Sequence, residues 1–310
     1  MEVIHQWWEM GLTTAATTLT LLLFFAMIAE NAERLIYSKD SLYNRILVYE
    51  EGFVRTLRLG VDPSARKQSS IALKDLNRHL LEYTQLTFAG LLLNNNPRKV
   101  LIIGLGGGVI PREMHGYFPE AEIDVVEIDS EVVEVAKKFF FFQPDERLRV
   151  YVSDGRVFVR RQAAKNPRPA YDMVILDAFN NGYIPFHMVT REFFQEVAAI
   201  LHPKSAVVAN VFRKNQFLDA QLQTFRAVYG RCYVFLGGHT TNAIVVCPGP
   251  DVSDLKPDVA LERANLLQRR HEFSFNLNTV ARQFKPRFRP KRSAQVLTDD
   301  HTPILHHHLC

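Results

Sequence analysis

The sequence predicts an α/β fold built on a mostly parallel sheet, and two observations lead to this prediction. From Lys99 onward, short apolar segments alternate with amphipathic segments of helical length, which is the pattern of strands joined by helical crossovers. A glycine-rich stretch directly follows the first apolar segment, where a strand, a turn and a helix bring backbone N–H groups close to a ligand. With 310 residues, of which 47% are hydrophobic, the chain is long enough for one large or two medium domains.

An uncharged run near the N-terminus is the first element. Residues 11–29, GLTTAATTLTLLLFFAMIA, carry no charge over 19 positions. As a helix they would span about 28 Å, close to the roughly 30 Å of a bilayer core. We therefore expect residues 1–36 to form a hydrophobic signal-anchor helix in a membrane, with a buried soluble helix and an unusual signal peptide as alternatives. Lys and Arg follow the run but do not precede it, so the large domain is expected to face the cytoplasm.

A small β domain is expected next, over residues 37–92. Residues 43–58, YNRILVYEEGFVRTLR, alternate apolar and polar side chains around Glu51 and Gly52, which indicates a β-hairpin. The pattern of residues 74–93 is helical, so the β domain is expected to end in a linking helix.

The larger domain is expected over residues 93–250. Strands are predicted at 99–105, 122–128, 148–153, 171–177 and 205–211, and helices near 130–141, 156–164, 190–201 and 216–228. The last two apolar stretches, 232–237 and 242–248, are typical of a hairpin that closes the sheet at its edge.

Charge separates the C-terminal segment, residues 251–310, from the rest. The chain has 37 basic and 33 acidic residues, a net charge of +4. Residues 263–292 contain nine Arg or Lys and one acid, so this stretch carries +8 and the remainder −4. A nucleic-acid surface spread over the fold is therefore not expected. The stretch RQFKPRFRPKR at 282–292 could lie on anionic lipid, with a solvated face or a dimer contact as alternatives.

The sequence predicts no metal site and no disulfide framework. Cys232, Cys247 and Cys310 lack C-x-x-C spacing and cannot all pair, so reduced, buried thiols in a cytosolic setting are expected. The three histidines at 306–308 are expected to be solvated.

The glycine turn indicates which nucleotide the fold binds. A dinucleotide fingerprint, G-x-G-x-x-G, would need glycine where Val109 stands, whereas Gly104, Gly106 and Gly108 satisfy G-x-G-x-G, the usual turn of S-adenosylmethionine-type folds. Glu127 ends the next strand, 127 − 104 = 23 residues further on, where an acid can accept hydrogen bonds from both ribose hydroxyls. Together these residues predict adenosine binding, although a glycine turn alone is also consistent with a tight turn.

Two further strand ends carry candidate residues. Asp154 and Gly155 follow the third strand, where the carboxylate can accept from the adenine amino group and the glycine lets the backbone approach the ring. Asp154 as the N-cap of the next helix is an equally good interpretation. Asp177 ends the fourth strand, at the sheet edge where ligands of open α/β folds bind.

Several motifs together resemble the spermidine synthase family of polyamine aminopropyltransferases. The resemblance covers about residues 38–250 and rests on VLIIGLGGGVIPRE, VVEIDSEVVEVAKKFF, VSDGRVFV and YDMVILDAFNNGYIP. QSSIALKD, EYTQ and LTDDHTPI resemble a divergent branch often joined to membrane segments. The resemblance implies an S-adenosylmethionine-dependent methyltransferase-type Rossmann fold with a small N-terminal β domain, and a homodimer.

The resemblance also implies a reaction. In that family, decarboxylated S-adenosylmethionine donates its aminopropyl group to an amine, usually putrescine. No tightly bound cofactor is expected; the donor, decarboxylated or intact, is a co-substrate. The attacking amine must be neutral, but alkyl ammonium groups have a pKa near 10, so a carboxylate is needed to hold the amine and accept its proton. Asp177 matches the family's proton-accepting aspartate.

The remaining site residues are carried over by position. Glu127, Asp154 and Gly155 match the family's nucleoside contacts. Tyr83 in EYTQ matches its amine-orienting tyrosine, with core packing as the alternative. Gln68, which opens QSSIALKD, and Asn44 are assigned to the donor.

Three positions depart from the family pattern. Asn44 stands in place of a donor-binding Gln, Gly107 in place of an aspartate inside the glycine loop, and Asn180 in place of the second aspartate of D-x-x-D. The two missing carboxylates would have bound ammonium groups, so putrescine is in doubt as the acceptor. Asp299 and Asp300 could supply substitutes if the C-terminal segment folds over the pocket. A methyltransferase and a non-catalytic nucleoside or polyamine sensor are the competing functions.

Overall fold

The computed structural model describes residues 32–60, 66–178 and 184–300, and it begins with a small antiparallel sheet. The predicted hairpin is confirmed, because β2 and β3 pair with Glu51 opposite Val54. One further strand lies on each side of it, and the sheet order follows the chain. Its strands are β1 (Arg34–Asp40), β2 (Arg45–Glu51), β3 (Val54–Leu59) and β4 (Lys67–Ala72).

The main sheet has seven described strands in the order β10-β11-β9-β8-β5-β6-β7. The five strands from β9 to β7 are parallel, whereas β11 and β10 form the predicted antiparallel hairpin at one edge. This arrangement confirms the predicted α/β Rossmann fold. Its strands are β5 (Lys99–Ile103), β6 (Glu122–Glu127), β7 (Leu148–Val152), β8 (Tyr171–Leu176), β9 (Leu201–Phe212), β10 (Tyr233–Leu236) and β11 (Asn242–Pro248).

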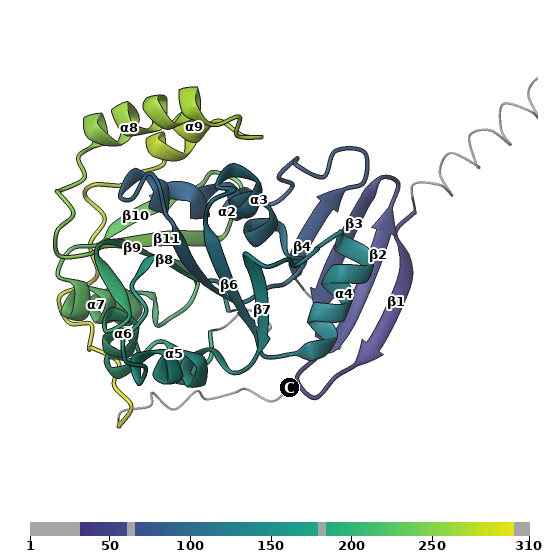
Figure 1. Cartoon of the computed structure of the whole chain (residues 1–310), viewed down its shortest axis with the longest axis horizontal. Helices are drawn as coiled ribbons and strands as arrows, with labels where there is room; N and C mark the ends of the chain where they lie inside the picture. Colours follow the sequence, from purple (N-terminus) through teal and green to yellow (C-terminus); the bar gives the residue numbers. More distant parts are fainter. Residues whose placement is uncertain (1–31, 61–65, 179–183, 301–310) are drawn as a thin grey trace, which may run out of the picture.

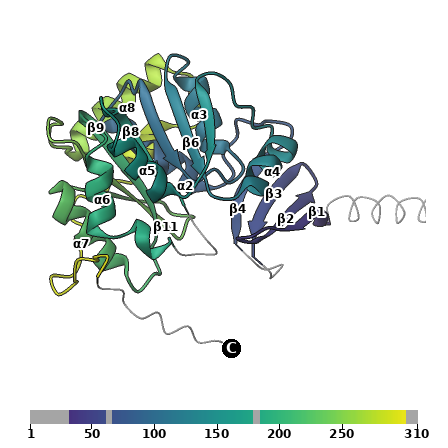
Figure 2. The ribbon, with the colours of Figure 1, turned by 60° about the horizontal axis from the view of Figure 1, so that its bottom comes forward.

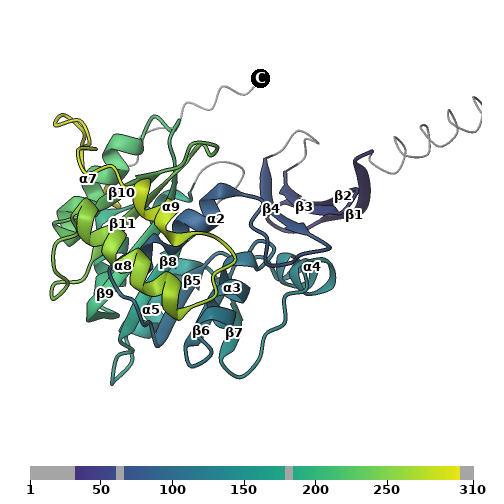
Figure 3. The ribbon, with the colours of Figure 1, turned by 90° about the horizontal axis from the view of Figure 1, so that it is seen from above.

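Helices cover both faces of the main sheet (Figure 1). The described helices are α2 (Glu82–Thr87), η1 (Phe88–Leu92), α3 (Val109–Tyr117), α4 (Ser130–Phe140), α5 (Gly155–Ala163), η2 (Phe186–Met188), α6 (Arg191–Ala198), α7 (Leu218–Tyr229), α8 (Pro257–Arg270) and α9 (Leu277–Arg282). Figure 2 shows α5, α6 and α7 near one another, and Figure 3 shows α8 and α9 over the other side.

The two faces follow from the alternation of side chains along each strand. Val100 and Ile102 of β5 join a buried cluster with α2, α3, α8 and α9. Leu101 and Ile103 of the same strand join a second cluster with α5, α6 and α7. Because both faces are buried, the strand is apolar at each successive position from Val100 to Ile103 rather than at every second one.

Helix α4 joins the small sheet to the main one (Figure 1). Val132 and Val135 pack with the small sheet, while Val133 and Ala136 belong to the cluster on the main sheet. Four consecutive phenylalanines, 139–142, stand at the C-terminal end of this helix, and Phe140 and Phe142 are buried.

The predicted linking helix at 74–93 is wrong in its first half. Helix begins only at Glu82, in α2. Before it, the carbonyl of Leu76 accepts a 2.6 Å hydrogen bond from Arg112, and the buried His79 ring lies 2.6 Å from the Thr84 hydroxyl. The backbone of this segment makes turn hydrogen bonds in place of helical ones, from the Asp75 amide to the Ala72 carbonyl and from the Arg78 amide to the Asp75 carbonyl.

The C-terminal segment is a packed part of the fold rather than a free basic surface. Its apolar residues Leu267, Leu277 and Val280 are buried in the main core. Beyond α9, main-chain hydrogen bonds join Gln283 and Lys285 to the outer edge of β10. The segment therefore covers an edge strand that would otherwise be open to pairing with another chain.

Cys232 and Cys247 form a disulfide, which corrects the prediction of reduced thiols. The β10–β11 register sets Tyr233 opposite Val246, so the two cysteines face each other directly across the hairpin, with Cα atoms 4.2 Å apart. Their spacing of 15 residues is not diagnostic without that register. Cys310 lies outside the described residues.

The proposed membrane anchor at 11–29 and the histidines at 306–308 also lie outside the described residues. None of the described helices is both long and apolar enough to cross a bilayer. β1 and the basic stretch at 282–292 lie at opposite ends of the described part of the molecule (Figure 1).

Candidate active site

A cavity of about 860 Å³ lies where the parallel strands of the main sheet end. The carboxyl ends of β5, β6, β8 and β9 form its floor, and residues of the small sheet and of the segment 79–85 line the opposite side. This is the position at which open α/β sheets bind ligands. The predicted site residues Asn44, Gln68, Tyr83, Gly104, Gly106, Glu127, Asp154, Gly155 and Asp177 all line it.

The glycine turn passes directly over the end of β8. Gly104 has a φ of +103°, and a Cβ at this position would lie 2.4 Å from the carbonyl oxygen of Asp177. A larger residue therefore fits neither the backbone conformation nor the space. Gly108 does not line the cavity; it precedes α3 in the left-handed conformation and packs against the Phe142 ring.

Glu127 is held at the end of β6 by the backbone. One carboxylate oxygen accepts a hydrogen bond from the Leu105 amide at 3.0 Å, and the other accepts from the Asp129 amide at 3.1 Å. Burial raises the pKa of Glu127 despite these bonds. Each oxygen retains a lone pair directed at a further donor, which suits a pair of ribose hydroxyls.

Asp154 is the N-cap of α5, as one of the two interpretations predicted, and it also lines the cavity. Its Oδ1 accepts from the Val157 amide at 2.9 Å and caps α5, while its Oδ2 lies 2.9 Å from Nε2 of His187. Burial opposes ionisation, but the Val157 amide and the His187 ring outweigh it and lower the pKa of Asp154. The capping carboxylate therefore also faces the cavity.

Asp177 is suited to act as a base near neutral pH. Burial raises its pKa to about 7, and the negative charge of Glu127 adds to this effect. The Asn210 amide opposes it by donating a 2.8 Å hydrogen bond to Oδ1 of Asp177. A carboxylate with a pKa close to the working pH can both accept and release a proton.

Tyr83 lies close enough to Asp177 for the negative charge of Asp177 to affect its pKa. Burial first, and then that negative charge, raise the pKa of Tyr83 well above 10, so the phenol stays neutral. Its hydroxyl donates to the carbonyl of Gln68 at 2.9 Å. The phenol oxygen can therefore accept a hydrogen bond from an ammonium group but has no second proton to donate.

Gly107 leaves no room for the aspartate of the family pattern. A Cβ at this position would lie 2.8 Å from Cβ of Ser69 and 2.9 Å from the Phe140 ring. The Gly107 amide instead donates to the Ser69 hydroxyl at 2.8 Å. Ser69 from the small sheet and Phe140 from α4 thus occupy the space that a carboxylate would need.

The predictions about Asn180 and about substitute carboxylates from the C-terminal segment remain. Asn180 lies outside the described residues. Asp299 is not among the residues lining the cavity and instead binds Arg156 and Thr190, so it does not replace a missing carboxylate. Asp300 does not line the cavity either; of the C-terminal segment up to residue 300, Thr279 does.

Sequence reasoning missed Asn210, Asn242 and His187. Asn210 lies in the apolar strand β9, binds Asp177, and is itself held by a 2.7 Å hydrogen bond from Asn242. A lone amide near the end of an otherwise apolar strand is a signal that could have identified it. His187 had no comparable signal, because its contact with Asp154 depends on how the loop after β8 folds.

Comparisons with known proteins agree with this geometry. Residues 81–237 match the spermine/spermidine synthase domain. The polyamine aminopropyltransferase of Vibrio vulnificus is 38% identical over 202 residues, covering 65% of this chain and 67% of that protein. The eEF1A lysine and N-terminal methyltransferase of Bos taurus is 31% identical over 220 residues, covering 66% of this chain and 31% of that protein. The chain thus spans about a third of that methyltransferase.

A solved structure of human methyltransferase-like protein 13 in complex with SAH is also similar. It has 30% identity and a TM-score of 0.57, and the match covers 68% of this chain and 96% of that one. The chain is thus similar both to a protein named as an aminopropyltransferase and to proteins named as methyltransferases. The domain match and the Vibrio relative show that this chain belongs to the spermine/spermidine synthase family, whose members are transferases.

Proposed function

We propose that this protein is an aminopropyltransferase that moves the aminopropyl group of decarboxylated S-adenosylmethionine to an amine, putrescine or a related polyamine. The observation that carries the proposal is Asp177, a carboxylate with a pKa of about 7 in the same cavity as Tyr83. An amine can approach a neutral phenol oxygen and a carboxylate here, and the latter accepts the proton that the amine must lose.

The reaction is a displacement at carbon. The amine lone pair attacks the propyl carbon next to the sulfonium, a C–N bond forms and the C–S bond breaks. The bonding electrons return to sulfur, which leaves as the neutral thioether methylthioadenosine. The proton lost by the amine passes to Asp177, and the pocket holds the donor's ribose at Glu127 and its adenine at Asp154.

A methyltransferase on the same site is the second candidate, and Gly107 favours it. Ser69 and Phe140 fill the space of a donor-binding aspartate, so the ammonium of a decarboxylated donor lacks that partner and the carboxylate of intact S-adenosylmethionine meets no repulsion there. The resemblance to methyltransferases supports the same choice.

One assay separates the two. The purified protein is incubated with intact or decarboxylated S-adenosylmethionine and a panel of amines, and the products are identified by mass spectrometry. Methylthioadenosine together with an aminopropylated amine supports the first proposal. A methylated product without methylthioadenosine rejects it in favour of the second, and tight nucleoside binding without turnover rejects both.

A further inference from the structure

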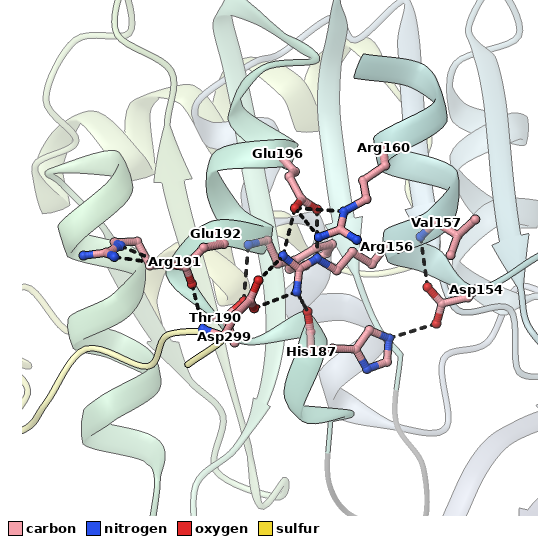
Figure 4. A network of polar contacts seen from close by, with 11 residues as sticks. Asp154, Arg156, Val157, Arg160, His187, Thr190, Arg191, Glu192, Glu196 and Asp299 are labelled. Atoms are coloured by element: carbon pink, nitrogen blue, oxygen red, sulfur yellow. Dashed lines mark hydrogen bonds and ion pairs between the residues drawn. The ribbon is translucent and has the colours of Figure 1, made fainter. Parts of the chain in front are cut away.

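Residues 297–299 are bound to the N-terminal end of α6, which follows the connection from β8. The Arg191 amide donates to the Leu297 carbonyl at 2.8 Å, and the Asp299 amide donates to the Glu192 carboxylate at 2.9 Å. The Thr190 hydroxyl donates to Oδ1 of Asp299 at 2.7 Å. A segment more than 100 residues away in the sequence therefore packs along this end of α6 (Figure 4).

The buried Arg156 side chain connects Asp299 to His187, which lies in η2 between β8 and α6. The Arg156 side chain has only 7% of its surface exposed, and its two terminal nitrogens each bind one oxygen of Asp299 at 2.7 Å. Glu196 binds the other edge of the guanidinium at 2.8 and 2.9 Å. Two bidentate partners fix the plane of the guanidinium, which a lysine could not reproduce.

The guanidinium of Arg156 also binds the main chain of His187. Nη1 of Arg156 donates to the His187 carbonyl at 3.0 Å, and the His187 ring reaches Oδ2 of Asp154 at 2.9 Å. Figure 4 shows the ring turned toward Asp154 and the carbonyl turned toward Arg156. His187 and Asp154 both line the cavity.

We propose that Asp299 is a positioning residue for the nucleoside end of the site: acting through Arg156, it fixes His187 so that His187 and Asp154 together form the surface that receives the adenine. The proposal rests on the proposed function only in that an adenosyl compound occupies the cavity. It applies equally to aminopropyl and methyl transfer, because the adenosine is common to both donors.

The charge on Asp299 is maintained across the working pH range. The Arg156 hydrogen bonds lower the pKa of Asp299 to about 2, so the carboxylate is ionised at neutral pH. Without it, Arg156 keeps Glu196 but loses the partner that sets its orientation toward the His187 carbonyl. The expected consequence is a loosely held His187 rather than a change at Asp177, which belongs to the other end of the cavity.

The test measures nucleoside binding to the full chain by calorimetry, with methylthioadenosine and S-adenosylhomocysteine as probes. Both Asp299→Asn and His187→Ala are expected to weaken binding about tenfold, the effect of one well-formed polar contact. In steady-state assays the donor KM rises by a similar factor, while kcat and the acceptor KM stay within about threefold. Arg160→Ala is the matched control, because exposed Arg160 also binds Glu196 but does not touch His187 in the contacts described.

A double-mutant cycle separates positioning from general stabilisation. If Asp299 acts through His187, Asp299→Asn adds less than about twofold in a His187→Ala background. A full tenfold loss in that background, or unchanged binding in either single variant, overturns the proposal. His187 is 47% exposed, so His187→Ala should fold, and unchanged nucleoside binding in that variant overturns the proposal even if Asp299→Asn melts below the assay temperature. Wild-type binding of methylthioadenosine without turnover would reject the proposed function but leave this test intact.

Discussion

The amide nitrogen of Asn210 donates a 2.8 Å hydrogen bond to Oδ1 of Asp177. The side-chain amide of Asn242 in turn donates to Oδ1 of Asn210 at 2.7 Å. The side-chain amide of Asn210 therefore cannot turn its oxygen toward Asp177 without losing that bond. The pair therefore favours the ionised form of Asp177, while burial and the charge of Glu127 favour the protonated form. The balance holds the pKa of Asp177 at about 7.

Removing the side-chain amide of Asn210 should raise the pKa of Asp177. In Asn210→Ala the ionised carboxylate loses its donor, so the pKa of Asp177 rises further. The pH profile of kcat/KM, which reports the free enzyme, should keep its shape while its acidic limb moves by about one unit to higher pH. Asn242→Ala should give a smaller shift in the same direction. A limb that stays in place or moves to lower pH would show that Asn210 does not tune the base.

Asp177→Asn should separate catalysis from binding. Loss of the base should lower kcat about 10²–10⁴-fold, whereas methylthioadenosine affinity should change little, since Glu127 and Asp154 bind elsewhere in the cavity. Calorimetry and a turnover assay on the same preparation measure both. Turnover at the wild-type rate would remove Asp177 as the proton acceptor.

The same variant should be more stable than the wild type. The folded-state pKa of about 7 lies above the unfolded value near 3.9, so the native state holds the proton more tightly and loses stability as the pH rises from about 4 to 7. Asparagine carries no such penalty. Unfolding by urea should show a gain of about 1–3 kcal/mol at pH 8 that disappears near pH 4; a gain independent of pH would point to packing instead.

The fold was predictable because its signals are local. The apolar strands, the glycine turn and the acid at the end of β6 follow one another at short spacing in the sequence. Each can therefore be recognised from neighbouring residues alone. The helix at 74–81 was predicted wrongly because Arg112, which binds the Leu76 carbonyl, comes from α3 and is brought to this segment only by the tertiary structure. The disulfide depended on the register of β10 and β11 in the same way.

The site was predictable where a strand end placed a residue and unpredictable where a loop did. Glu127, Asp154 and Asp177 all follow β-strands, so the sheet brings them to one edge. His187 lies in the one-turn helix η2 and Asp299 near the end of the described chain, and only folding brings them to Arg156. Polar networks of this kind leave little trace in hydrophobic periodicity.

Gly107→Asp should not restore the family's carboxylate. The new Cβ would press on Ser69 and the fully buried Phe140, so the substitution should lower the free energy of unfolding by roughly 1–3 kcal/mol. Pairing it with Ser69→Gly should recover part of this loss, because one of the two clashes is removed. Denaturant melts of the two variants, with Gly116→Asp in open space as the control, measure the effect. An unchanged melt for Gly107→Asp would show that the loop yields freely.

The rim of the cavity bears on the choice of acceptor. The exposed side chains of Arg66, Lys67 and Lys214 line it, and the guanidinium of Arg66 stacks on Phe212 at 3.8 Å. Glu82 also lines the cavity, but its two oxygens accept hydrogen bonds from the amides of loop 238–239. The second ammonium of a diamine that reaches these three cationic side chains would be repelled by them.

Lys214→Glu should therefore improve diamines as acceptors. The exchange replaces repulsion with attraction, so the KM for putrescine should fall several-fold at low salt while the KM of the donor stays unchanged. The gain should shrink in 0.5 M salt, where the screening length is only a few ångströms. Lys204→Glu provides the control, since exposed Lys204 lies toward the opposite end of β9. A KM for putrescine that rises in Lys214→Glu would mean that the acceptor's distal end is not cationic in this site, and acceptors with an acidic or neutral distal end would then be the ones to assay.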